Sequence, residues 1–157
     1  FTTRPATWFS MYASMLARVE IFDELGQERL ERISQICIEH GLREGDVVFE
    51  QNARSDGLYI ILGGAIDIQV QAPGAAAPAT VARLKPGQSF GEVALVDEGI
   101  RTATARVGSA EARLLALRRA DLMELCREDF ELGFVLMRNL AADLALKIRQ
   151  TDLRVRS

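Results

Sequence analysis

The most informative stretch of this sequence runs from residue 90 to residue 105 and reads Phe90-Gly91-Glu92-Val93-Ala94-Leu95-Val96-Asp97-Glu98-Gly99-Ile100-Arg101-Thr102-Ala103-Thr104-Ala105. Gly91 has no side chain, so the backbone there can approach a ligand closely. Residues 92–96 predict one helical turn whose free N–H groups can point at an anion. Arg101 follows a turn that contains Gly99, and its planar guanidinium can bind two phosphate oxygens at once. The stretch therefore predicts an anion-binding site.

Glu92 places a carboxylate beside this predicted anion cradle. A bound phosphate would repel it, so we expect its partner to be a sugar hydroxyl, as in dinucleotide sites where an acidic side chain binds ribose. The cradle, Arg101 and Glu92 together predict a nucleotide with few phosphate groups. The sequence has no loop ending in GKS or GKT, which is the pattern of triphosphate and magnesium sites.

Short apolar runs separated by turn residues surround this stretch. The strand-like segments are 47–49, 58–62, 66–70, 80–84, 102–107 and 112–117. Residues 72–79 are rich in alanine, proline and glycine and predict a flexible hairpin tip. Short strands at this spacing predict an antiparallel β-barrel or jelly roll.

Helical periodicity replaces the strand pattern at both ends of the chain. Apolar residues from Trp8 to Val19 predict a first helix, and those from Leu30 to Cys37 predict a second, which Gly41 would end. Two more helices are expected at residues 120–126 and at roughly 130–153. The apolar stripes of the last helix are Phe134, Met137, Ala141, Leu144 and Ile148, and, beside them, Leu132, Leu136 and Leu140. This helix has more apolar surface than one contact needs, so we expect it to make two contacts, with the second stripe pairing with another subunit.

The fold class that follows is α+β, an antiparallel β-barrel or jelly roll with helices before and after it in the sequence. With 157 residues the chain is long enough for one core, so we expect a single domain. Its expected parts are N-terminal helices in 1–41, the barrel with its 90–105 segment in 42–118, and C-terminal helices in 119–157. Because the chain begins with Phe1 rather than Met, we expect it to be a fragment of a longer protein.

Composition argues against several classes of protein. A formal net charge of −3 gives no overall positive field to attract nucleic acid, and no apolar run reaches the ~20 residues of a membrane-spanning helix. Cys37 and Cys126 show no CxxC spacing, which favours free thiols in the cytoplasm. His40 is the single histidine, and no nucleophile stands near a base, so we expect no enzyme activity, no metal and no cofactor.

The pattern FGE-x-AL, followed by a short turn and R-T-A-T, closely resembles the phosphate-binding cassette of the cyclic-nucleotide-binding domain family. This family includes protein kinase A regulatory subunits, cyclic-nucleotide-gated channels and the catabolite activator protein. Residues 45–49 and 56–64 resemble the family's first barrel strands and glycine turn. The likeness extends over roughly residues 20–150.

The resemblance implies that the ligand is cAMP or cGMP. Glu92 matches the acid that binds the ribose 2′-hydroxyl, and Arg101 matches the arginine that binds the cyclic phosphate. The ligand-binding residues implied are Gly91, Glu92, Val93, Ala94, Arg101, Thr102 and Ala103. The Thr102 hydroxyl can reach the phosphate or a guanine edge. The C-terminal helix is implied to close as a lid over the base, with Leu140, Leu144 and Ile148 as the covering residues.

Three departures from the family pattern leave alternatives open. Ile100 stands where proline is frequent, Asn52 stands where glycine is frequent, and no helix-turn-helix follows residue 153. The chain is therefore expected to be a sensor that regulates a fused or associated effector, with a homodimer through the C-terminal helix as a further expectation. The alternatives are a ligand-free interaction module with a degenerate pocket, and the sensor half of a transcription regulator without its DNA-binding domain.

Overall fold

A computed structural model describes the backbone of residues 6–156 and the side chains of residues 11–150. The chain forms two compact units. The β unit comprises residues 36–122, and the helical unit comprises the described residues before and after it. Each unit is described separately below. The division of the sequence into one domain with the boundaries given above stays a prediction.

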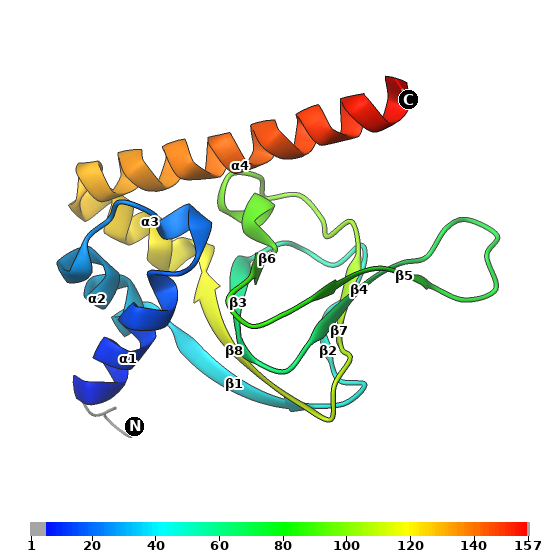
Figure 1. The fold of residues 1–157 in the computed structure, drawn as a ribbon, viewed down its shortest axis with the longest axis horizontal. Coiled ribbons are helices and arrows are strands. Elements are labelled where there is room, and N and C mark those ends of the chain that lie inside the picture. The colour runs from blue at the N-terminus through cyan, green and yellow to red at the C-terminus, as the bar shows by residue number, and fades with distance from the viewer. Residues whose placement is uncertain (1–5, 157) are drawn as a thin grey trace. The chain divides into compact units, whose positions relative to one another are not determined.

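The β unit is an eight-stranded antiparallel jelly roll (Figure 1). Its strands are β1 (Ile38–Arg43), β2 (Val47–Phe49), β3 (Gly57–Gly63), β4 (Ile66–Val70), β5 (Ala79–Leu84), β6 (Ser89–Phe90), β7 (Thr104–Val107) and β8 (Glu111–Arg118). They form two four-stranded sheets, with the order β1-β8-β3-β6 in one and β2-β7-β4-β5 in the other. The predicted fold class is confirmed.

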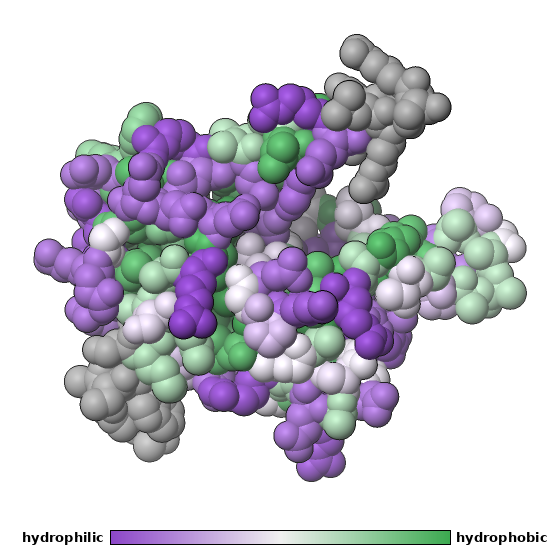
Figure 2. Space-filling model, in the orientation of Figure 1, coloured by the Kyte–Doolittle hydropathy of each residue, from purple (hydrophilic) through white to green (hydrophobic). Residues whose placement is uncertain are grey.

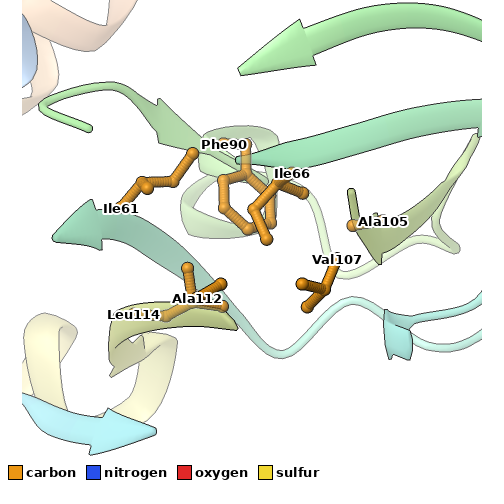
Figure 3. Close-up of a cluster of buried hydrophobic side chains, with 7 residues drawn as sticks. All are labelled: Ile61, Ile66, Phe90, Ala105, Val107, Ala112 and Leu114. Carbon is orange, nitrogen blue, oxygen red and sulfur yellow. The ribbon is translucent and has the colours of Figure 1, made fainter. Parts of the chain in front are cut away.

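The core of the β unit contains side chains from both sheets (Figure 3). One cluster within it consists of Ile61, Ile66, Phe90, Ala105, Val107, Ala112 and Leu114. Ala105 and Val107 alternate with more exposed neighbours on β7, as expected for a strand with one face in the core. Phe90 and Ala105 are also the two ends of the 90–105 segment, so this segment leaves the core at one end and returns to it at the other.

The first strand was not predicted. The second helix, α2 (Gln27–Ile36), ends at Ile36, and Gly41 lies inside β1, so the prediction that Gly41 ends this helix is wrong. The reason is tertiary: every residue of β1 pairs with β8, from Ile38 opposite Ala116 to Arg43 opposite Glu111. His40 is therefore an exposed residue of a strand.

The hairpin between β4 and β5 extends away from the sheets (Figure 1). β5 is the outer strand of its sheet, and its residues are almost all exposed. The tip, residues 72–78, consists of alanine, proline and glycine, and the projecting hairpin is coloured mostly in the middle of the hydropathy scale (Figure 2). The prediction of a hairpin tip within residues 72–79 is confirmed to within one residue, because Ala79 begins β5.

The helical unit contains α1 (Ala6–Leu16), a 3₁₀ turn η1 (Glu20–Phe22), most of α2, most of α3 (Arg119–Glu128) and α4 (Phe130–Arg156). On α1, Tyr12 is buried and Met11 is 42% exposed, while the side chain of Trp8 lies outside the described residues. None of the described helices is long and apolar enough to cross a membrane.

The second apolar stripe of α4 is buried within this one chain. Leu132, Leu136 and Leu140 are each no more than 1% exposed, so the prediction that they pair with another subunit is wrong. The side chain of Asn139 fixes α4 to η1, because its amide nitrogen donates to the carbonyl oxygens of Ile21 (3.1 Å) and Asp23 (2.7 Å).

Ion pairs join α2 to the junction between α3 and α4. Arg29 Nε lies 2.8 Å from Asp129 Oδ2, and Arg32 Nη2 lies 3.0 Å from Glu128 Oε2. Asp129 Oδ1 also accepts a hydrogen bond from the N–H of Leu132 and so caps α4 (3.1 Å). The hydrogen bond from Arg29 is the main cause that lowers the pKa of Asp129. Glu28 stands four residues before Arg32 on α2, but Arg32 pairs with Glu128 and Asp129.

Candidate functional site

Arg101 is a buried cation, with 4% of its side chain exposed. Its Nη2 donates to the carbonyl oxygen of Gly57 (2.7 Å) and its Nη1 to that of Gly91 (3.4 Å). Asp56 Oδ1 lies 3.5 Å from Nη2, but 78% of the Asp56 side chain is exposed to solvent, which weakens its attraction for the guanidinium. Burial lowers the pKa of Arg101, against the attraction of Tyr59 and Asp56. A buried cation so weakly neutralised favours an added anion.

The Nε atom of Arg101 is a buried N–H without a hydrogen-bond partner among the described residues. Leaving a buried donor unsatisfied costs about 1–3 kcal/mol, so such groups call for an explanation when they occur in native proteins. An acceptor oxygen at this atom would remove the cost. The charge of Arg101 and its free donor both fit a phosphate oxygen.

Backbone pairing holds Arg101 in place. Its N–H donates to Ala53 O (2.7 Å), and its carbonyl oxygen accepts from the N–H of Asn52 (2.8 Å). Asn52 has φ of 73°, a left-handed conformation that asparagine tolerates better than most residues other than glycine. Ile100, the residue before Arg101, forms an antiparallel bridge with Arg54, and its side chain is 60% exposed.

Gly91 joins the 3₁₀ turn η2 (Glu92–Leu95) to Arg101. It caps η2 with φ of 78°, and its carbonyl oxygen accepts both the N–H of Ala94 (3.1 Å) and Nη1 of Arg101. A β-carbon at position 91 would lie 2.7 Å from Nη1 of Arg101. Glycine is thus required here by the positive φ and by the close approach of the guanidinium.

The predicted site residues fall into two groups, the binding residues in the β unit and the lid residues on α4. The helical turn predicted at 92–96 is confirmed, with Glu92 and Ala94 buried and Val93 48% exposed. Thr102 is exposed and Ala103 half-buried, and both precede β7. All seven predicted binding residues lie in the β unit, where Gly91 and Arg101 are in direct contact.

The predicted lid residues lie on α4, in the helical unit. Leu140 is buried, Leu144 is half-buried and Ile148 is 62% exposed. Their contact with a ligand stays a prediction.

Two contributors to the site were missed in the sequence. Gly57 acts through its carbonyl oxygen, which no side-chain pattern reveals. The ring of Phe49 lies under the guanidinium of Arg101, with the Cζ atom 4.0 Å from the ring centroid. The available signal was that Phe49 is an aromatic residue at the end of a strand, three positions before the turn at Asn52.

Comparison with known proteins identifies the family. The family model described as "Cyclic nucleotide-binding domain" matches residues 39–129, which include β1 except its first residue, β2 to β8, and α3. The chain therefore belongs to the cyclic nucleotide-binding domain family.

Individual relatives have different overall functions. The chain is 38% identical over 112 residues to the cyclic AMP receptor protein of Thermus thermophilus, a match that covers 71% of this chain and 49% of that protein. It is 31% identical over 100 residues to a cGMP-dependent protein kinase of Drosophila melanogaster, covering 64% and 11% of the two chains. A solved structure, the N-terminal domain of a transcriptional regulator from Streptomyces coelicolor, superposes with a TM-score of 0.77 and 28% identity over 85% of this chain and 94% of that one. The matches span half or less of the length of the two curated relatives.

Proposed function

We propose that this chain is a sensor domain that binds cAMP or cGMP and regulates a fused or associated effector. The observation that carries the proposal is the buried Arg101, whose Nε–H lacks an acceptor among the described residues. A cyclic phosphate supplies both the missing acceptor and a negative charge. The names of the relatives support both nucleotides, since one is a cyclic AMP receptor protein and another a cGMP-dependent kinase.

In this proposal each residue of the site has a distinct role. Arg101 binds the cyclic phosphate, and the backbone of residues 91–94 lies against it. Glu92 accepts the ribose 2′-hydroxyl. Thr102 and Ala103 follow Arg101 directly, and the exposed hydroxyl of Thr102 is available to the phosphate or to a guanine base. No step of this binding needs a metal, a cofactor or catalysis.

Regulation in this proposal depends on α4. Leu140, Leu144 and Ile148 cover the base when α4 closes as a lid. The ligand shifts the lid equilibrium only by the difference between its affinities for the closed and open states. Any pairing of α4 with a second copy of the chain would use exposed apolar side chains such as Phe134, which is 66% exposed.

Calorimetric titration with cAMP, cGMP and 5′-AMP at one salt concentration tests the proposal. We expect a micromolar or tighter dissociation constant for at least one cyclic nucleotide. Binding of 5′-AMP should be much weaker, because it lacks the cyclic ester and carries a larger charge into a site built around one arginine. If neither cyclic nucleotide binds a chain that circular dichroism shows to be folded, the chain is the ligand-free interaction module instead.

A second candidate function is the sensor half of a transcription regulator. It is favoured by the similarity to the Streptomyces coelicolor domain, which belongs to a transcriptional regulator. Measuring whether the full-length gene product binds DNA in a cyclic-nucleotide-dependent way distinguishes this effector from a kinase or a channel.

Replacing Gly91 with alanine should weaken cyclic-nucleotide binding at least tenfold. The left-handed φ should cost about 1–2 kcal/mol of stability, and the new β-carbon would push against Nη1 of Arg101. Gly87→Ala is the matched control, because Gly87 has a similar φ of 89° and open space within 4 Å of the new β-carbon. Gly91→Ala should lose at least as much stability as Gly87→Ala in chemical denaturation. Equal affinities of the two variants in calorimetry would show that the approach of Gly91 to Arg101 does not matter for binding.

A further inference from the structure

The ring of Phe49 is the surface on which the guanidinium of Arg101 rests. The Cζ atom of Arg101 lies 4.0 Å from the ring centroid of Phe49, well inside the range of a cation–π interaction. The carbonyl oxygens of Gly57 and Gly91 hold the two terminal nitrogens of the same guanidinium. Phe49, Gly57 and Gly91 together therefore fix the guanidinium in place and leave Nε without an acceptor among the described residues.

Phe49 is itself held by two other aromatic rings. Its centroid lies 5.8 Å from that of Tyr59 and 5.9 Å from that of Phe90, and these two rings stack on each other at 5.4 Å. The three residues come from β2, β3 and β6, so rings from both sheets support one another. A ring packed in this way loses little further freedom when a cation lies on it.

A π face and a carboxylate support a buried arginine in different ways. A buried carboxylate would neutralise Arg101 and compete with an incoming phosphate for its N–H groups. The face of Phe49 attracts the cation through its quadrupole but accepts no in-plane hydrogen bond from it. Asp56 lies at the edge of the guanidinium and is largely solvated, so it competes weakly.

We propose that Phe49 is a positioning residue for ligand binding: its ring holds the Arg101 guanidinium charged and oriented, with donors available for an anionic oxygen. This inference rests on the proposed binding of a cyclic nucleotide through Arg101. It adds that the affinity for the phosphate depends on the π face of Phe49, beyond the contribution of its apolar volume.

Phe49→Leu removes the π face and keeps a large apolar side chain. We expect it to weaken binding of cAMP or cGMP by about 10-fold to 30-fold, the range expected for a desolvated cation–π contact. Phe49→Tyr keeps the face and should bind within about threefold of the original chain. The matched control is Phe90→Leu. Phe90 belongs to the same aromatic cluster, but among the described residues the guanidinium of Arg101 lies over Phe49 and not over Phe90. Phe90→Leu should lower the unfolding temperature and change the affinity less than Phe49→Leu does.

A graded substitution separates the π face from packing more sharply. Incorporating phenylalanine with increasing numbers of ring fluorines at position 49 withdraws electron density from the face with little change of shape. We expect the affinity for the cyclic nucleotide to fall stepwise with fluorine number, while circular dichroism shows that the ligand-free protein stays folded. If Phe49→Leu does not fold, the fluorinated series still tests whether binding depends on the π face.

The results distinguish this inference from the proposed function. If the original chain binds a cyclic nucleotide and the fluorinated series binds it with unchanged affinity, Phe49 is a packing residue and the inference is wrong. If the original chain binds neither cyclic nucleotide, the proposed function fails and this inference fails with it. A stepwise loss in the series, together with retained binding by Phe49→Tyr, supports both.

Discussion

Arg101→Gln is expected to abolish micromolar binding of cAMP and cGMP while leaving the domain folded. The variant removes the positive charge and the Nε–H donor that would meet the cyclic phosphate. Truncating one side of a buried charge pair costs about 2–5 kcal/mol, which is about a 30-fold to 4,000-fold loss of affinity. Calorimetric titration measures the loss, and binding within threefold of the original chain would refute the assignment of Arg101.

The stability of the ligand-free protein should respond differently from its affinity. Arg101 is 5% exposed, burial lowers its pKa, and its Nε–H is unsatisfied among the described residues. Replacing Arg101 removes the cost of burying a charge but also removes the donors to the carbonyl oxygens of Gly57 and Gly91, so the two effects oppose each other. We therefore expect a small net change in the unfolding temperature without ligand, and the ligand-induced increase to disappear.

Arg83→Gln is the matched control for Arg101→Gln. It removes the same charge from the β unit, but the Arg83 side chain is 57% exposed and pairs with Asp67, with 2.7 Å between Nε and Oδ1. Because the Asp67 side chain is only 14% exposed, losing this partner should cost about 1–3 kcal/mol of stability, and the domain should stay folded. It should also bind cyclic nucleotide normally, so a loss of affinity in both variants would point to overall charge rather than to the site.

Local patterns in the sequence predicted much of the fold. The alternation of residues 66–70 reproduces the bounds of β4, and the helical turn expected at 92–96 is present as η2. β1 was missed because its pairing partner β8 lies some seventy residues further along the chain, and pairing at that distance leaves no local signal. β6 has two residues, too few for any period to be visible.

The sequence predicted those parts of the candidate site that consist of side chains or glycines within one short motif. Gly91, Glu92 and Arg101 belong to such a motif, and the structure brings Arg101 against Gly91. Phe49 was missed because a strand residue that supports a cation has the same apolar pattern as one that fills a core. The contribution of Gly57 comes from its backbone carbonyl, which any residue could supply in a suitable position.

Gly57→Ala is expected to damage the fold and the site together. A β-carbon at this position would overlap the carbonyl oxygen of Leu117 and lie 3.1 Å from the Cα of Arg118, both backbone atoms of the paired strand β8. Because backbone atoms cannot rotate away, β3 must shift, at a cost of about 1–3 kcal/mol or more. The shift also moves the carbonyl oxygen that holds Nη2 of Arg101 at 2.7 Å. Chemical denaturation should show lower stability, and calorimetry should show at least a tenfold loss of cyclic-nucleotide affinity.

Gly63→Ala, on the same strand, separates this effect from the general cost of altering a glycine in β3. A β-carbon at Gly63 meets nothing within 4 Å, and the backbone there is not left-handed. We expect this variant to keep its affinity and to gain up to about 1 kcal/mol of stability, because alanine restricts the unfolded chain. If Gly57→Ala instead unfolds at the same denaturant concentration as Gly63→Ala and binds as tightly, then β8 yields easily at Leu117. In that case the carbonyl of Gly57 would not be needed to hold Arg101, and the aromatic support and Gly91 would suffice.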